Sequence, residues 1–309
     1  MVPQEKPGIL SQKIGVGLVM VHRVLKKLTQ EGVVEKIGSA PKVYYRIQKH
    51  SIARISKEYN DLPDLVSNFY MITPDGQKQE GISAFVMWCE KRGFNVPEKA
   101  HEYEQEYKKY STGNIINATQ KIKASFPGNV QLDSLVYLQP YSIPVFGKTK
   151  LSQMLFHGKQ TQNREILVEV FNYIKQDVIT YISNNAIDAV AFIPPTLKRE
   201  VQAMDVLKNV LNLTLPIIEI EKIKTPIMVQ QKSLKDINDR ILNAQNTMII
   251  PKYYKDTQYQ KILLIDDFAG SGATLNVLAG KIKSQHIAQE CHGLAITGSM
   301  NGFDVIREI

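Results

Sequence analysis

The chain has 309 residues, of which 43% are hydrophobic and 22% are charged, a composition typical of soluble globular proteins. Because single cores stop growing near ~250–300 residues, we expect two or three domains. The first thirty residues show no signal-peptide pattern and no apolar run reaches the ~18 residues of a membrane span, so we predict a cytoplasmic protein. The two cysteines, Cys89 and Cys291, argue against a disulfide framework and against a zinc site.

The net charge of +8 is concentrated at the start of the chain. Residues 1–57 contain eleven Lys and Arg residues against three acidic residues, whereas basic and acidic residues are equal in number in the remainder. Such asymmetry indicates a basic module joined to a body with a different task. The natural partner of a basic module is a polyanion, such as nucleic acid.

The basic segment predicts two short helices followed by a hairpin. LSQKIG is a helical turn that ends at Gly15, and apolar residues then recur at helical spacing from Leu18 to Gly32, a glycine suited to ending a helix. VVEKIG and KVYYRI, on either side of SAP, are rich in Val, Ile and Tyr and predict two paired strands.

Together, residues 10–47 resemble the winged helix-turn-helix family of DNA-binding domains. The resemblance implies that the helix from Leu18 to Gln30 enters a major groove and that the hairpin forms the wing. The preceding segment is too short and proline-rich to supply the helix that usually begins this fold. Either a downstream helix or a partner chain completes it, or the module has lost DNA binding. Packing against the rest of the protein, or protein binding, stays open as an alternative. The side chains that would face nucleic acid are His22, Arg23, Lys26 and Lys27, with Lys42 on the wing.

Residues 51–132 predict a helical connector or dimerisation region without a chemical motif. HSIARISKEYNDLPDLVSNFYMI, ISAFVMWCEKRGF and VPEKAHEYEQEYKKYS all show apolar residues at helical spacing. Pro97 suits the first turn of the last segment, and PDG at 74–76 is a turn signal. We therefore expect three regions: 1–50, 51–132 and 133–309.

The third region alternates between strand and helix patterns. SLVYLQ, AIDAVAFIPP, LPIIEIEKI, KILLI and HGLAIT contain candidate strands, and REILVEVFNYIKQDVITYIS, KREVQAMDVLKNVLN and ATLNVLAGKIKSQ are candidate helices. Strands separated by helical crossovers imply an α/β fold with a mostly parallel sheet and helices on both faces. Ligands bind such sheets at the carboxyl ends of the strands.

The stretch KILLIDDFAGSGATL carries the chemistry of this region. KILLI is apolar without alternation, as suits a central strand buried on both faces. Asp266 and Asp267 follow it and can accept hydrogen bonds from a sugar diol. Small residues then lead into a helix, so backbone N–H groups and the positive helix terminus can surround a phosphate. A phosphate beside a diol describes a ribose 5-phosphate. The loop residues are Ala269, Gly270, Ser271, Gly272, Ala273 and Thr274, of which Ser271 and Thr274 add hydroxyl groups.

ILLIDDFAGSGATL resembles the phosphoribosyl pyrophosphate motif of type I phosphoribosyltransferases. The resemblance implies that Asp266 and Asp267 are the catalytic carboxylates near the ribose hydroxyls and that residues 269–274 surround the 5-phosphate. It also implies phosphoribosyl pyrophosphate as ligand, together with Mg²⁺. Gly270 stands where the family more often has Thr, which removes one hydroxyl donor. The stretch is not a Walker loop, because no Lys-Ser/Thr pair follows the glycines.

Looser matches extend the resemblance over roughly residues 140–300. FIPPTLKRE stands where the family has its pyrophosphate loop, and QQKSLKDINDRILNAQNTMII resembles a Gln-x-x-Leu, Arg-x-x-Asn segment of the ComF-like branch. KLSQMLFHGKQ is similar to the segment before that branch's first helix. A surface role for the basic residues in these segments is an equal alternative. The counterparts of the ComF-like segment are Gln231, Leu234, Arg240 and Asn243, and the candidate pyrophosphate partners are Lys159, Lys198, Arg199 and Arg240.

Three functions fit these patterns. The first is a nucleic-acid-associated phosphoribosyltransferase, or a related enzyme that acts on a nucleotide. The sequence shows no motif for the acceptor of the phosphoribosyl group. The second is a regulator that senses the sugar phosphate without turnover and alters DNA binding. The third is an effector subunit of a bacterial anti-phage system of the retron type, held by a nucleic-acid or protein partner. A homo-oligomer is a further expectation, and no membrane partner is expected.

Overall fold

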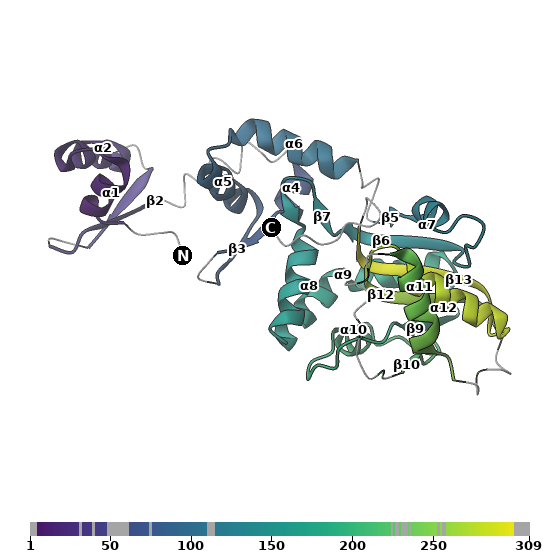
Figure 1. Cartoon of the computed structure of the whole chain (residues 1–309). Helices are drawn as coiled ribbons and strands as arrows, with labels where there is room; N and C mark the ends of the chain where they lie inside the picture. The colour runs from purple at the N-terminus through teal and green to yellow at the C-terminus, as the bar shows by residue number, and fades with distance from the viewer. Residues whose placement is uncertain are drawn as a thin grey trace. The chain divides into compact units, whose positions relative to one another are not determined.

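The computed structural model describes residues 5–30, 33–38, 41–47, 62–73, 76–109, 115–223, 236–251 and 258–299, with the single residues 225, 229, 234 and 254. The chain is a mixed α/β protein that groups into two compact units, Met1–Glu104 and Gln105–Ile309 (Figure 1). The predicted connector, residues 51–132, is divided between these units. Each unit is described by itself.

The first unit begins with two helices and a hairpin. α1 (Pro7–Ile14) has Pro7 in its first turn and ends at Gly15, which adopts a left-handed conformation. α2 (Leu18–Gln30) buries Val21 and Leu25 against the hairpin of β1 (Val34–Ile37) and β2 (Tyr44–Ile47), which pair antiparallel. The predicted order of helix, helix and hairpin is therefore confirmed. The first helix starts earlier than expected because proline is tolerated in a first turn.

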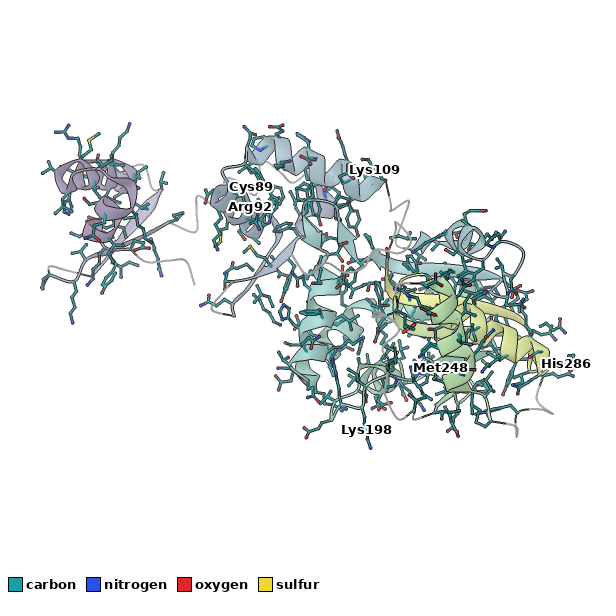
Figure 2. The ribbon with its side chains drawn as sticks, in the orientation of Figure 1. Cys89, Arg92, Lys109, Lys198, Met248 and His286 are labelled. Carbon is teal, nitrogen blue, oxygen red and sulfur yellow. The ribbon has the colours of Figure 1, made fainter. Side chains whose placement is uncertain are left out.

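The rest of the first unit combines helices with a second hairpin. Its elements are α4 (Pro63–Asn68), β3 (Tyr70–Ile72), β4 (Lys78–Glu80), α5 (Gly81–Arg92) and the start of α6 (Val96–Lys108). Aromatic rings of Phe69, Phe85 and Trp88 contact one another in its core, near Cys89 and Arg92 (Figure 2). The helix predicted through YMI is wrong, since Tyr70–Ile72 pairs with Lys78–Glu80 across a turn in which Gly76 has a φ of 81°. The part of that prediction between residues 48 and 61 lies outside the described residues.

The second unit contains a five-stranded sheet in the order β5-β6-β13-β12-β9. All neighbouring strands are parallel except β5 with β6, so the predicted, mostly parallel sheet is confirmed. The interior strand β12, between β13 and β9, buries four consecutive apolar residues, 262–265. The strands are β5 (Ile116–Asn117), β6 (Ser134–Pro140), β9 (Ala189–Phe192), β12 (Tyr259–Ala269) and β13 (Ala288–Gly298).

The run LPIIEIEKI does not form one strand. Ile217 makes a single bridge beside Val190 of the main sheet, whereas β10 (Glu221–Lys222) pairs with β11 (Met248–Ile249) in a separate two-stranded sheet. The run is divided because its two ends find different partners. A further short hairpin joins β7 (Ser142–Ile143) to β8 (Gly147–Lys148).

Helices of the second unit form two packed groups. α8 (Lys150–Gln160) and α10 (Ala203–Leu211) both pack on the long helix α9 (Arg164–Asn184), and α11 (Ile237–Thr247) packs on α12 (Ala273–Ser284). The helix predicted from residue 198 begins only at Ala203. Gln202 instead donates from Nε2 to the carbonyls of Leu197 and Arg199, at 3.1 and 3.2 Å, which closes a loop. A short helix, α7 (Thr119–Ser125), precedes β6.

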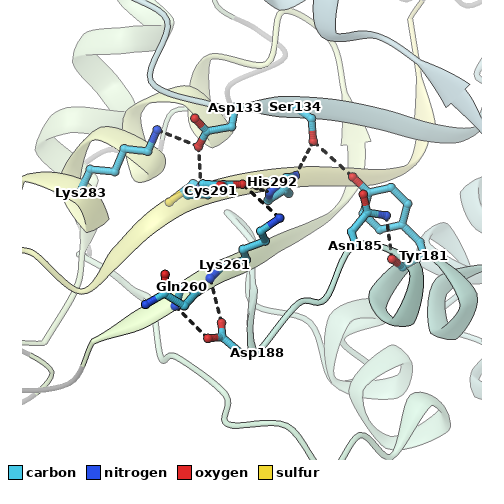
Figure 3. Close-up of polar contacts among 11 residues, drawn as sticks. Asp133, Ser134, Tyr181, Asn185, Asp188, Gln260, Lys261, Lys283, Cys291 and His292 are labelled. Atoms are coloured by element: carbon cyan, nitrogen blue, oxygen red, sulfur yellow. Dashed lines mark hydrogen bonds and ion pairs between the residues drawn. The ribbon is translucent and has the colours of Figure 1, made fainter.

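Polar contacts hold the amino ends of the strands together (Figure 3). The Asp188 carboxylate accepts hydrogen bonds from the backbone N–H groups of residues 260 and 261, at 2.8 and 2.9 Å. Asp133 likewise accepts from the N–H of Cys291 at 2.6 Å, and Ser134 contacts Nδ1 of His292 at 2.7 Å. The carboxylates of Asp188 and Asp133 and the ring of His292 therefore have hydrogen-bond partners within the fold at this end of the sheet. The small-residue loop lies at the opposite end of the sheet, after the carboxyl end of β12.

Both cysteines are buried and free, as expected for small apolar residues. Burial raises the pKa of Cys89 to about 11 and that of Cys291 to about 12, which disfavours the reactive thiolate. Within the described part of the chain, no single helix is long and apolar enough to cross a membrane. The neighbouring helices α1 and α2 reach that length and apolar character only when counted together, across a 113° bend.

Candidate functional site

The carboxylate pair lies near the carboxyl end of β12. Asp266 and Asp267 are partly buried, and the strand continues two residues further to Ala269. The Asp267 N–H donates to Oδ1 of Asp266 at 2.7 Å, and Nζ of Lys159 in α8 forms an ion pair with Asp267. Parallel strands β9 and β13 flank β12, so the two aspartates emerge where the topology predicts a ligand crevice.

The two carboxyl groups differ electrostatically. Burial, reinforced by the negative charge of Asp267, raises the pKa of Asp266 from 3.8 to about 7. Lys159 and the backbone N–H groups of Asp267 and Phe268 act in the opposite direction. Asp266 can therefore gain or lose its proton near neutral pH, so that its carboxyl group can donate as well as accept a hydrogen bond.

The loop after β12 is a tight strand-to-helix turn. Gly272 has a φ of 78°, and a Cβ built there would lie 2.4 Å from Cδ1 of Ile122 in α7. Ser271 is buried and its Oγ accepts a long hydrogen bond, 3.4 Å, from the N–H of Ala273, the first residue of α12. The positive end of α12 thus opens beside small residues, an arrangement suited to a phosphate group.

A lysine from outside the motif holds this loop in place. Nζ of Lys121 in α7 donates to the Gly270 carbonyl at 2.7 Å and also to the Ser299 carbonyl just after β13. The same ammonium lies over the ring of Tyr137 at 5.5 Å from its centroid. Lys121 therefore links three segments, namely α7, the loop after β12 and the end of β13. Lys121 is not among the predicted site residues, because residue 121 lies in the segment predicted as a helical connector without a chemical motif.

A cavity of about 500 Å³ contains the carboxylate pair and the whole loop from Ala269 to Thr274. This volume is within the ~300–1,000 Å³ range of small-molecule sites. Its apolar wall includes Leu155 and Phe156 of α8, and Tyr141 lies against Phe268 with ring centroids 5.0 Å apart. The predicted ribose and phosphate residues therefore share one cavity.

Three of the four candidate pyrophosphate residues border the same cavity, namely Lys159, Arg199 and Arg240. Arg199 donates from Nη1 to the carbonyl of Lys159, and Arg240 donates from Nε to the Leu234 carbonyl at 2.8 Å. Burial lowers the pKa of Arg240, whose Nη1 lies 3.3 Å from a Cβ built on Gly270. Lys198 is exposed, points outward in Figure 2 and lines a different cavity.

That second cavity, about 240 Å³, shares the wall formed by residues 194–196 with the first. Nζ of Lys222 in β10 donates to Oγ1 of Thr196 at 2.8 Å, and burial lowers the pKa of Lys222 while Asp266 opposes that shift. Asn243, a counterpart in the ComF-like segment, also lines it, and its buried Oδ1 has no hydrogen-bond partner among the described residues. Lys222 is not among the predicted site residues, because it lies in a predicted strand to which no role was assigned. Gln231 lies outside the described residues.

The candidate nucleic-acid residues belong to the first unit. His22, Arg23, Lys26 and Lys27 are exposed along α2, and Lys42 is exposed just before β2. Their exposure is compatible with binding a polyanion, and the predicted contact with nucleic acid stays a prediction.

Among the described residues, no cluster of three or more His, Cys, Asp and Glu side chains could hold a metal ion. A scan against models of protein families found no match for the chain, and a search of curated proteins found none. The function is therefore argued from the cavity itself.

Proposed function

We propose that the second unit binds phosphoribosyl pyrophosphate, or a related ligand that carries a ribose 5-phosphate group. The observation that supports this is the position of Asp266 and Asp267 in the same 500 Å³ cavity as the loop from Ala269 to Thr274. The positive start of α12 suits the 5-phosphate, and the carboxylates suit the neighbouring diol. As part of the same proposal, the second unit is related to type I phosphoribosyltransferases and the first unit is related to a winged helix.

The cations around the cavity suit the pyrophosphate end of such a ligand. Lys159, Arg199 and Arg240 border the cavity, and Lys222 lies behind the shared wall. Their charges would stabilise a departing pyrophosphate. The apolar side chains Leu155 and Phe156 would keep water from the reacting carbon.

The residues present fit a magnesium ion that arrives with its ligand. Two carboxylates at one strand end are too few for an all-protein site, but Mg²⁺ is commonly held by one or two carboxylates together with substrate phosphates. When bound, Mg²⁺ would neutralise charge on the pyrophosphate group. Asp266 and Asp267 are the side chains that would share in holding it.

We further propose that this site transfers the phosphoribosyl group. The bond between the anomeric carbon and the pyrophosphate oxygen breaks, a bond to the acceptor nucleophile forms, and the acceptor releases its proton to a base or to water. Asp266, whose pKa is raised to about 7, would exchange a proton near the ribose of the bound ligand. Binding without transfer would describe a sensor or a latent effector of an anti-phage system.

Calorimetric titration of the full chain with phosphoribosyl pyrophosphate and Mg²⁺ tests the binding proposal. Replacing Asp266 and Asp267 together by Asn should abolish binding while the fold is kept. Asp205→Asn is a matched control, because Asp205 is exposed and borders neither cavity. Equal affinity of the wild-type chain and the double variant would refute the assignment of the carboxylates to the ribose.

A pyrophosphate-release assay on the same samples tests transfer. Release that depends on one added acceptor, among mixed nucleobases and nucleic acids, would establish the enzyme and identify its substrate. Binding without release under all of these conditions would instead favour the sensor or the latent effector.

A further inference from the structure

The turn between α1 and α2 carries an exposed aliphatic surface. Its members are Ile14, Val16, Leu18, Val19 and Met20, with exposed fractions of 61, 37, 48, 79 and 49%. We refer to these five residues as the aliphatic patch. Scattered apolar residues are normal on a surface, but five of them within seven positions indicate an interaction site.

The patch continues into a basic surface. α2 turns Val21 and Leu25 into the core, so the opposite side of the helix faces outward. Spacing of four and seven residues places Arg23 and Lys26 on the same side as Val19, and Lys27 on the same side as Met20. The outward side of α2 is thus aliphatic in its first turn, whereas the following turns expose cations beside a single apolar residue, Val24.

This distribution disfavours sequence reading in a DNA groove. Helices that read DNA contact base edges with residues near their amino end, by hydrogen bonds. Here those positions hold Leu18, Val19 and Met20, whose side chains have no strong hydrogen-bonding group. The patch also contains no aromatic ring on which an unpaired base could stack.

Two other occupants fit less well. A second copy that bound through the same surface, as in a two-fold dimer, would bring Arg23, Lys26 and Lys27 against the same cations, and like charges at an interface are costly. A membrane-surface helix keeps an apolar face along its whole length, whereas α2 buries that face in the core of its own unit.

We propose that the aliphatic patch and the cations Arg23, Lys26 and Lys27 bind a protein partner through an acidic segment with apolar anchor residues. The apolar anchors would be buried on Val19 and Met20, and the acidic groups would pair with the basic turns of α2. Charge complementarity of this kind guides association and selects the partner. This inference does not rest on the proposed chemistry of the second unit, so the two can fail independently.

Site-specific photocrosslinking from position 19 of the full chain, in the native host, tests the proposal. The expected product is a crosslinked polypeptide, and mass spectrometry should place the crosslink in a segment with net negative charge and apolar residues. Position 90, an exposed glutamate of α5, serves as the control crosslinking site. Crosslinks to nucleic acid, to lipid, to a second copy or to a segment that is not acidic would overturn the proposal. Crosslinking at position 19 that does not exceed the control would do the same.

Two variants test the contributions of the aliphatic patch and of the cations, and a third serves as a control. Val19→Asp should reduce recovery of the crosslinked partner from a second site, position 24, by about tenfold or more, as for a central interface residue. Val66→Asp makes the same change at another exposed valine of the first unit, outside the patch, and should have no effect. Replacing Lys26 and Lys27 by Glu should reduce recovery similarly. Thermal unfolding of each variant checks that the fold is kept. Recovery unchanged by Val19→Asp and by the Lys26 and Lys27 double variant would count against the surface.

Discussion

Lys159 and Asp267 form an ion pair that joins helix α8 to the end of strand β12. Arg199, in the loop after β9, donates to the backbone carbonyl of the same lysine. This loop therefore also contacts the ion-paired lysine. The side chains of Lys159 and Asp267 keep exposed fractions of 33 and 22%, so a ligand can reach both. The pair therefore sets the charge at the proposed ribose position.

Lys159→Met should weaken binding of phosphoribosyl pyrophosphate by about tenfold at pH 7, because one charge-assisted contact, ~1.5–3 kcal/mol, is lost. Lys159 also lowers the pKa of Asp266, so its removal should raise that pKa further. Calorimetry at pH 7 and pH 9 separates these effects, since the protonation effect should shrink at the higher pH. Lys150→Met, in the same helix but away from the cavity, should bind like the wild type. Wild-type affinity of Lys159→Met at both pH values would remove Lys159 from the site.

Asp266 should make the stability of the fold depend on pH in an unusual direction. Its pKa is raised from 3.8 to about 7, so the folded state holds this proton more tightly than the unfolded state does. The stabilising contribution is complete below pH 3.8 and is lost as the pH rises through about 7. The slope in this window should reach about 1 kcal/mol per pH unit.

Denaturant unfolding at pH 5 and pH 8, for the wild type and Asp266→Asn, isolates this contribution from those of other acids. The variant should gain stability relative to the wild type as the pH rises. If the difference between the two proteins is the same at both pH values, the carboxyl group titrates at an ordinary pKa.

Much of the fold and the core of the site follow from local patterns in the sequence. KILLI, the acid pair and the small-residue loop are contiguous, so strand, turn and helix could be predicted from one stretch. Lys121 could not be predicted, because it reaches the Gly270 carbonyl from 149 positions earlier in the chain. Lys198 and Arg199 were equivalent in sequence, yet only Arg199 borders the first cavity, since adjacent residues in an extended loop point to different sides.

The helix predicted through Tyr70–Ile72 failed for another reason. Tyr70–Ile72 continued a helical apolar spacing, but a spacing pattern in a short run does not separate a helix from a strand. The pairing with Lys78–Glu80 decided the conformation.

Two glycines of the proposed phosphate loop should respond oppositely to a side chain. Gly272→Ala should destabilise the loop by about 1–2 kcal/mol, because φ is 78° and the new Cβ meets Ile122. Gly270→Ser should be tolerated, since the nearest atom to its Cβ is Nη1 of Arg240, 3.3 Å away at the flexible end of a side chain. A serine there adds a hydroxyl donor and should tighten ribose 5-phosphate binding about threefold or more.

Calorimetry with ribose 5-phosphate checks the glycine prediction, alongside thermal unfolding of both variants. Unchanged affinity of Gly270→Ser for ribose 5-phosphate, with the fold intact, would show that the phosphate does not approach this position.

Lys121→Met should weaken ribose 5-phosphate binding about tenfold without a matching loss of pyrophosphate binding. The substitution removes the donor to the Gly270 and Ser299 carbonyls, at a cost of about 1–3 kcal/mol, and loosens the loop that would hold the 5-phosphate. Lys121→Arg keeps the charge and should restore part of the affinity. Lys123→Met is the matched control, because Lys123 is exposed in the same helix. Separate titrations with the two ligands distinguish positioning from general damage: an equal loss for both would mean that Lys121 supports the unit as a whole rather than the loop.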